Sequence, residues 1–423
     1  MNGLIVFSIL LLSATASASS LASDDTLAQV IAATTSNSER LLSSKMSEKI
    51  AELKTALADT GYMPDINAEA IDSTGFSGST GLLGVGGIMG SPYRSGYGYG
   101  LVATQPIFDF GKTSRLRASA EALAAAARKD TELVRVDVMR GAIDAYVQCA
   151  LAQSEIENWS AINQESGVLA REISKYVSTG QRSVVEDSLA RGQHDEASRT
   201  QATFEKRLEV MKRRLAILTG WPTEKVACRP IEEVAAKAPD ESPGSPTVIL
   251  KAEAQLRLSE ADLRAARAGY LPRIVGLASV GNVEDARVVQ KTQYALGVGV
   301  IIPLFDSGRT NVEVDRAKVS IEKSSHDLKA AHQEIDSSNA QYDDQIQAAE
   351  TELEFLKVDL GDAEKALQQA KKRYANMSGT LVDLRESVRN LSKVKAEISE
   401  YRAQLVRMTW LKAIVNGRFV GAD

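Results

Sequence analysis

Few residues in this sequence have both the type and the spacing that catalysis or metal binding requires. The three histidines, His194, His326 and His332, all fall in stretches with helical periodicity, and no Cys, Asp or Glu surrounds them in the pattern of a metal site or a nucleophile triad. We therefore expect that the protein is not an enzyme and that it carries no metal or cofactor.

Two carboxylates near the C-terminus form an acidic pair. Asp383 and Glu386 lie three residues apart in a helical pattern, and side chains at this spacing share one helix face. Carboxylates held close together disfavour mutual ionisation and attract cations. The alternative is a solvated helix face on which Arg385, Arg389 and Lys393 simply pair with these acids.

The sequence contains two cysteines, Cys149 and Cys228, whose spacing matches no metal motif. Residues 4–12 form an apolar run too short for a membrane span, and small residues ending at Ala18 follow it. This pattern predicts a signal peptide over residues 1–18 and hence export to an oxidising compartment. The two thiols could pair there, and two separate buried thiols are the alternative.

Composition excludes several classes of function. Aromatic residues make up only 5% of the 423, and Ala, Ser, Leu, Glu, Lys and Arg dominate long tracts, which favours long helices over compact cores. The 55 acidic and 50 basic residues are interspersed, so no nucleic-acid partner is expected. After residue 18 no apolar stretch approaches the roughly 20 residues of a transmembrane helix, so any membrane contact must come from strands or a partner.

The chain contains an internal repeat that spans nearly its whole length. Residues 61–64 read Gly-Tyr-Met-Pro and residues 269–272 read Gly-Tyr-Leu-Pro. Residues 105–113 (QPIFDFGKT) likewise return as residues 302–310 (IPLFDSGRT). Two copies of the same strand-to-helix element are therefore expected.

The repeat divides the chain into successive parts. After the signal peptide we expect a first repeat over residues 19–221, built from a helix, a β-hairpin and a long helical hairpin. Residues 222–246 hold five of the ten prolines and are interpreted as a linker or equatorial segment. The second repeat covers residues 247–417, and residues 418–423 form a C-terminal tail.

Each half contains stretches in which the hydrophobic period drops to two. Residues 65–70, 97–104 and 294–301 alternate in side-chain character, as strands with two different faces do. Strands of about 10 residues cross a bilayer when tilted, and the loops expected at residues 75–96 and 282–291 would then be extracellular. A soluble β-hairpin is the alternative for each pair. Four strands cannot close a barrel around a channel, so closure predicts a homo-oligomer.

Long helical patterns follow the two Pro-x-Phe-Asp-x-Gly motifs. No proline occurs from residue 112 to residue 221, so a helix that begins at Lys112 and runs to Tyr176 would be on the order of 100 Å long. Seven-residue spacing in the second half predicts coiled-coil packing. The residues at this spacing are Ile321, Leu328, Ile335, Tyr342, Ala349 and Leu356, with a second seam at Ile346, Leu353, Leu360, Leu367 and Tyr374.

These features together resemble the TolC family of outer-membrane factors, which comprises outer-membrane efflux proteins and the outer-membrane channels of type I secretion. The resemblance rests on the repeat, the two Gly-Tyr-x-Pro turns, the two Pro-x-Phe-Asp-x-Gly junctions and the Leu-Thr-Gly and Val-Asn-Gly ends of the halves. It implies an α+β membrane protein in which each protomer gives four transmembrane β-strands and long coiled-coil helices to a trimer. The trimer would form a 12-stranded β-barrel and a hollow α-barrel, in the outer membrane with a long periplasmic extension.

The resemblance also assigns roles to the two strand-to-helix junctions. Pro106 and Pro303 would lie where a strand swings into a helix, since proline has a fixed φ and no N–H to donate. Asp109 and Asp306 are expected as N-caps, or as residues that serve folding alone. Gly111 and Gly308 complete the two junctions, which are Pro106, Asp109 and Gly111, and Pro303, Asp306 and Gly308.

At the opposite end, the resemblance implies a periplasmic gate and a docking site. Asp383 and Glu386 match acidic positions at the family's periplasmic entrance, so a trimer would carry six carboxylates around a narrow opening that multivalent cations could block. A periplasmic adaptor would dock on the helical turns. Their residues are Thr179, Gly180 and Gln181 in the first half, and Ser378, Gly379 and Thr380 in the second, where the Gly comes two residues late.

The implied function is passive conduction through the outer-membrane channel of a tripartite export system. Its partners would be a periplasmic adaptor, an inner-membrane ABC or proton-driven pump, outer-membrane lipid and two further copies of the chain. Proteins and small molecules both remain open as cargo. A periplasmic coiled-coil adaptor or tether is the alternative function, although adaptors carry one helical hairpin where this chain is expected to have two.

Overall fold

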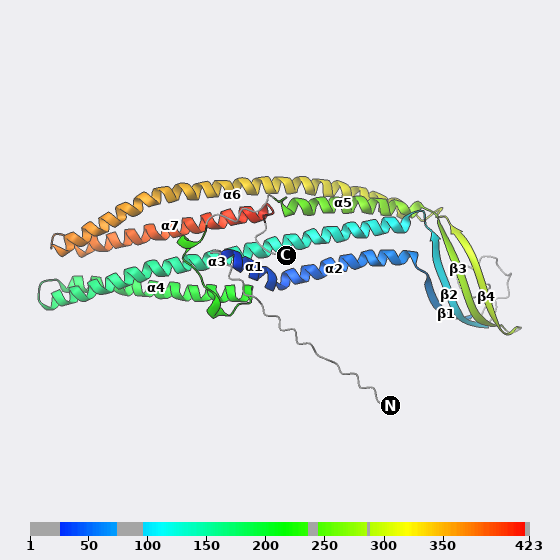
Figure 1. Cartoon of the computed structure of the whole chain (residues 1–423), viewed down its shortest axis with the longest axis horizontal. Helices are drawn as coiled ribbons and strands as arrows, with labels where there is room; N and C mark the ends of the chain where they lie inside the picture. The colour runs from blue at the N-terminus through cyan, green and yellow to red at the C-terminus, as the bar shows by residue number, and fades with distance from the viewer. Residues whose placement is uncertain (1–25, 74–95, 236–243, 286–287, 419–423) are drawn as a thin grey trace, which may run out of the picture.

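The computed structural model describes residues 26–73, 96–235, 244–285 and 288–418. The expected signal peptide and most of the expected loop at 75–96 lie outside this part of the chain. The molecule is elongated, with a small sheet at one end and the tips of two helical hairpins at the other (Figure 1). The α-helices are α1 (Thr26–Asn37), α2 (Glu39–Asp59), α3 (Lys112–Ser178), α4 (Val184–Thr219), α5 (Thr247–Arg267), α6 (Arg309–Ala375) and α7 (Leu381–Val415).

The four described strands form one antiparallel sheet in the order β1-β2-β3-β4. They are β1 (Asp65–Ser73), β2 (Gly96–Phe108), β3 (Arg273–Asp285) and β4 (Val288–Ile301). The central pair joins the two halves of the chain, because β2 comes from the first half and β3 from the second. The strands predicted from alternation are thereby confirmed.

The loop predicted at residues 282–291 is wrong in extent. β3 continues to Asp285 and β4 begins at Val288, so most of that segment is paired strand. Polar residues can pair across a hairpin when their side chains bond to each other, as Asn282 does here by accepting from Thr292 Oγ1 at 2.8 Å. The sequence predicted a loop here because the stretch is polar, and a sequence pattern does not show which residues will pair across two strands.

Two helices of 67 residues each, α3 and α6, run the full length of the molecule (Figure 1). At ~1.5 Å per residue each is about 100 Å long. In Figure 1, α2 and α5 lie beside them toward the sheet, whereas α4 and α7 lie beside them toward the hairpin tips. In the described part of the chain, no helix is both long and apolar enough to cross a membrane.

The predicted seven-residue seams of α6 are confirmed as its buried face. Ile335, Ala349 and Leu356 are buried on the first seam, and Leu367 and Tyr374 on the second. Buried side chains at this spacing keep one face of a long helix against its neighbours along its whole length.

A second set of buried residues on α6 was not predicted, because its members are small or polar. Ala317, Ser324 and Ala331 are buried, and the Ser324 hydroxyl lies 2.9 Å from the Ser259 hydroxyl of α5. Small side chains allow two helix backbones to approach closely, and a hydrophobic pattern alone does not reveal them.

The described part of the segment interpreted as a linker packs across α3, α4 and α7. We call residues 222–235 the belt; it contains two single turns of 3₁₀ helix, Thr223–Lys225 and Ile231–Glu233. Ile231 is fully buried, and the Glu232 carboxylate accepts from Ser154 of α3 at 2.5 Å and from Ser399 of α7 at 2.6 Å. The belt therefore connects α3 to α7.

Cys149 of α3 and Cys228 of the belt form a disulfide, with their Cα atoms 5.7 Å apart. It lies in the largest hydrophobic core, beside the fully buried Tyr146 and Trp410. The bond closes a loop across a sequence separation of 79 residues. A cross-link that closes so long a loop removes much conformational entropy from the unfolded chain.

Replacing both Cys149 and Cys228 by Ala is expected to lower the free energy of unfolding by about 2–5 kcal/mol, because the loop is no longer closed in the unfolded state. Thermal unfolding followed by circular dichroism, with and without reductant, measures the effect. Reductant should destabilise the wild type and leave the double variant unchanged. A reductant effect of equal size in both proteins would contradict the prediction.

Candidate functional site

The two strand-to-helix junctions share one hydrogen-bond pattern. The Asp109 carboxylate accepts from the backbone N–H of Gly111 at 3.0 Å and of Thr113 at 2.6 Å. Asp306 accepts from Gly308 at 3.1 Å and from the backbone N–H of Thr310 at 2.9 Å. Each carboxylate thus satisfies a backbone donor in the first turn of a long helix.

The expected N-cap position of the two aspartates is wrong by two residues. The residues that directly precede α3 and α6 are Gly111 and Gly308, with φ of 84° and 81°. The left-handed conformation turns the chain sharply, so the aspartate two residues upstream reaches the first helical turn. Burial acts to raise the pKa of Asp109, but the hydrogen bonds from Thr113 and Gly111 outweigh it and lower that pKa.

The two prolines differ in position, although the motifs match. Pro106 lies within β2, which continues to Phe108 with a register shift between the two residues. Pro303 lies after the end of β4 at Ile301. Only Pro303 therefore stands between strand and helix as expected, whereas Pro106 stands at a bulge inside a strand.

In each half of the chain, the Gly-Tyr-x-Pro turn packs against the strand-to-helix junction, which explains why the two motifs occur together in both halves. A Cβ added to Gly61 would lie 3.0 Å from Thr113 Cγ2, and one added to Gly269 would lie 2.9 Å from Thr310 Cγ2. The contact at Gly269 is closer than real Cβ atoms come to a neighbour, and the contact at Gly61 is tighter than nearly all of them, so each turn favours Gly against the threonine that its aspartate caps.

The two turns proposed for adaptor docking lie at the hairpin tips and are mostly exposed. Thr179, Gly180 and Gln181 connect α3 to α4, and Gly180 has φ of 75°. In the second turn the positive φ belongs to Met377 rather than to Gly379. A Cβ on Gly379 would lie 3.0 Å from the Cβ of Arg373, so this Gly permits a close approach instead of a left-handed turn. That difference explains its later position in the sequence.

The expected gate carboxylates have different surroundings. Asp383 is the third residue of α7 and forms a reciprocal cap with Thr380: its carboxylate accepts from Thr380 N at 3.2 Å, and Thr380 Oγ1 accepts from Asp383 N at 3.1 Å. Hydrogen bonds from the Thr380 side chain and backbone lower the pKa of Asp383. Glu386 is exposed one turn later on the same helix.

Two of the three basic residues of α7 that could pair with these acids have other partners. Arg389 pairs with Glu196 of α4 at 3.4 Å, and Lys393 pairs with Glu397 at 3.6 Å. The charge of Arg373, at the end of α6, contributes to the lowered pKa of Asp383.

One contact at the tips was not predicted from the sequence. Arg182, just before α4, donates to the backbone oxygen of Tyr374 at 3.2 Å, and its guanidinium lies 4.4 Å from the centroid of the Tyr374 ring. The same guanidinium pairs with Glu186 at 3.3 Å, and the side chain is only 13% exposed. We call the contact of Arg182 with Tyr374 the latch, because it ties the α3–α4 hairpin to the α6–α7 hairpin.

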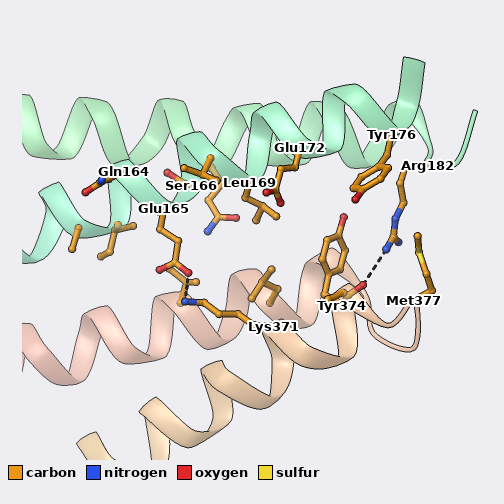
Figure 2. A pocket seen from close by; sticks show the side chains of 17 residues that line it. Gln164, Glu165, Ser166, Leu169, Glu172, Tyr176, Arg182, Lys371, Tyr374 and Met377 are labelled. Carbon is orange, nitrogen blue, oxygen red and sulfur yellow. Dashed lines mark hydrogen bonds and ion pairs between the residues drawn. The ribbon is translucent and has the colours of Figure 1, made fainter. Parts of the chain in front are cut away.

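Beside the latch, a cavity of about 570 Å³ lies between the two hairpins. All four helices contribute to its walls, and an ion pair between Glu165 and Lys371 spans it (Figure 2). The sequence could not predict this cavity. Helical periodicity shows which side chains share one face of a helix, but it does not show how two hairpins pack or where they leave a space.

A protein-family model described as outer membrane efflux protein matches residues 30–221 and 245–409. The chain belongs to the outer membrane efflux protein family. Members of this efflux family are outer-membrane channels that work in tripartite systems with an adaptor and an inner-membrane pump. The chain is accordingly an outer-membrane efflux channel whose long helices extend into the periplasm.

Curated relatives agree with this membership. The efflux protein is 24% identical to the pyoverdine export outer membrane protein OpmQ of Pseudomonas aeruginosa over 382 residues, which cover 84% of this chain and 77% of OpmQ. It is 22% identical to the outer membrane protein TolC of Vibrio cholerae over 275 residues, which cover 61% of this chain and 62% of TolC.

Solved structures show the same fold. The outer-membrane channel OprN superposes with a TM-score of 0.77 at 18% identity, covering 93% of this efflux protein and 90% of OprN. The outer membrane protein VceC of Vibrio cholerae superposes with a TM-score of 0.73 at 17% identity, covering 92% and 96% of the two chains. The predicted fold of a helical barrel component with a small sheet is thereby confirmed.

Replacing Asp383 by Ala is expected to make amide hydrogen exchange in the first turn of α7 several-fold faster at neutral pH, because the reciprocal cap is lost. The pKa of Asp383 is lower in the folded protein than its ordinary value of 3.8. The stabilisation that its ionised carboxylate gives to α7 is therefore complete above pH 3.8, and it is lost as the pH falls through the lower pKa of the folded protein. The difference from wild type should therefore vanish at acid pH.

Glu386→Ala is the matched control, because it removes the same charge from the same helix and leaves the cap intact. Equal exchange in the two variants at neutral pH would show that Asp383 does not cap α7.

Proposed function

We propose that three copies of this chain form the outer-membrane duct of a tripartite export system, which passively conducts proteins or small molecules delivered by an inner-membrane ABC or proton-driven pump. The observation that carries the proposal is the incomplete sheet. β1 and β4 are its two edges, so each leaves unpaired backbone groups in a single chain. Edges of this kind are satisfied when copies of the sheet close on one another.

The outer face of β4 supports a lipid environment for that assembly. Leu296 is 91% exposed, and Tyr294, Val298 and Val300 on the same face are exposed as well. The intervening residues are Ala295, Gly297 and Gly299. A continuous apolar strand face is costly in water, and it is the pattern that strands present to lipid in a transmembrane barrel.

We further propose that the hairpin tips form the periplasmic gate. In a trimer, Asp383 and Glu386 would supply six carboxylates, and two of the basic residues nearest to them in the helix are already paired with other acids. The latch would hold the two hairpins of each protomer together in the closed arrangement. The exposed turns at residues 179–181 and 378–380 would receive the adaptor.

The adaptor alternative is less well supported. A periplasmic tether needs neither an apolar strand face nor a sheet with two open edges, and the chain has both. The doubled hairpin also matches outer-membrane channels over more than nine-tenths of this chain.

The double variant Asp383→Asn/Glu386→Gln is expected to raise the concentration of a trivalent cation needed to block single channels in planar bilayers by about tenfold or more, because a ring of like charges attracts multivalent cations. Glu397→Gln is the control, since Glu397 lies on the same helix and pairs with Lys393. Unchanged block in the double variant would overturn the gate, and the absence of any channel in the wild type would overturn the duct.

Replacing Arg182 by Ala is expected to raise the ratio of open to closed time about tenfold in the same recordings, because a largely buried charged donor and its carbonyl partner are separated. The control is Arg213→Ala, which breaks an exposed ion pair with Glu209 on α4. An open-to-closed ratio that Arg182→Ala leaves at the wild-type value would contradict the role of the latch.

A further inference from the structure

The cavity beside the latch has the features of a ligand site, and it serves no purpose in the mechanism above. Its walls are largely apolar and include Ile162, Val168, Leu169 and Val388. At about 570 Å³ it is in the size range of pockets that hold small organic molecules. It lies between the hairpins, so it exists only while the two are apposed.

Two polar side chains in its wall are almost completely buried and lack a partner. Tyr374 and Gln193 are each 9% exposed, and neither the Tyr374 hydroxyl nor Gln193 Oε1 has a hydrogen-bond partner. A buried polar atom without a partner is destabilising, because it has lost its hydrogen bonds to water and gained none in the protein. An occupant with hydrogen-bond donors would remove that cost.

The charges around the cavity leave one carboxylate uncompensated. Lys371 pairs with Glu165, and Arg182 pairs with Glu186. Glu172 also lines the cavity; it is exposed to solvent and has no ion pair or hydrogen bond among the described residues. Because both basic side chains of the wall are paired with other acids, Glu172 is the carboxylate of this site that a monocation would pair with.

The geometry of the side chains matches that charge. Figure 2 shows Glu172 and Tyr176 of α3 pointing toward Tyr374 of α6 across the cavity. Aromatic rings attract cations to their faces, and the Tyr176 ring is 43% exposed and carries no such contact in the described chain. A cationic head with N–H donors would thus meet a carboxylate, a phenol and an amide oxygen, while its apolar body meets the aliphatic wall.

We propose that this cavity binds a small amphipathic organic cation, a protonated amine with an aromatic or aliphatic body, and that the bound cation favours the closed hairpins. The second part rests on the proposed function. A ligand whose walls come from both hairpins binds the apposed arrangement and shifts the equilibrium toward it.

The direct test is isothermal titration calorimetry of the purified full-length protein in detergent with naphthylmethylammonium as probe. Naphthylmethanol, which has the same body without the charge, is the matched ligand. We expect about one cation bound per chain and binding of the alcohol at least about tenfold weaker. Equal affinity for the alcohol would overturn the proposal.

Three variants test the site itself. Glu172→Gln keeps the shape and removes the charge, so the Kd for the cation should rise about tenfold. Leu169→Trp should abolish binding by filling the cavity. Glu157→Gln, on the same helix but outside the cavity, should bind as the wild type does. Wild-type affinity in Glu172→Gln would overturn the proposal, even if Leu169→Trp fails to fold.

Single-channel recordings on the same preparations separate this inference from the proposed function. Channels that conduct but do not bind the probe overturn the ligand site alone. Protein that binds the probe selectively but never conducts overturns the duct alone. Probe that binds and lengthens closed times in the wild type, but not in Glu172→Gln, supports both.

Discussion

Lateral burial of two very long helices is the constraint on which the rest of this structure depends. A helix of 67 residues is amphipathic and has too little intrinsic stability to stand alone in water, so α3 and α6 need neighbours along their whole length. Shorter helices supply that packing in relay, α2 and α5 toward the sheet and α4 and α7 toward the tips (Figure 1).

The repeated motifs allowed much of the fold to be predicted, because each motif encodes a local requirement. These requirements depend on a few residues of sequence or on a single contact. They are an aspartate that caps a helix, a glycine at positive φ, and a glycine packed against a threonine. The seven-residue seams were predictable for the same reason. The position error at these motifs came from the local backbone: Gly111 adopts a positive φ, so Asp109 caps α3 from two residues further upstream than expected.

The candidate site was less predictable, because its key contacts cross between hairpins. Nothing near Arg182 in the sequence indicates that its guanidinium will meet Tyr374, and the buried small residues of α6 carry no hydrophobic signal. The acidic pair was visible from spacing, but the reciprocal cap was not. That cap orients the Asp383 carboxylate at the start of α7, whereas Glu386 is exposed and has no hydrogen bond or ion pair among the described residues.

The belt has a mechanical consequence. By bonding to Ser154 and Ser399 through one carboxylate, and to α3 through a disulfide, it ties the middle of α3 to α7. In the proposed duct, this tie would confine bending of α3 to the stretch between the belt and the tips. Opening at the tips would then leave the sheet at the other end, and its pairing with neighbouring copies, undisturbed.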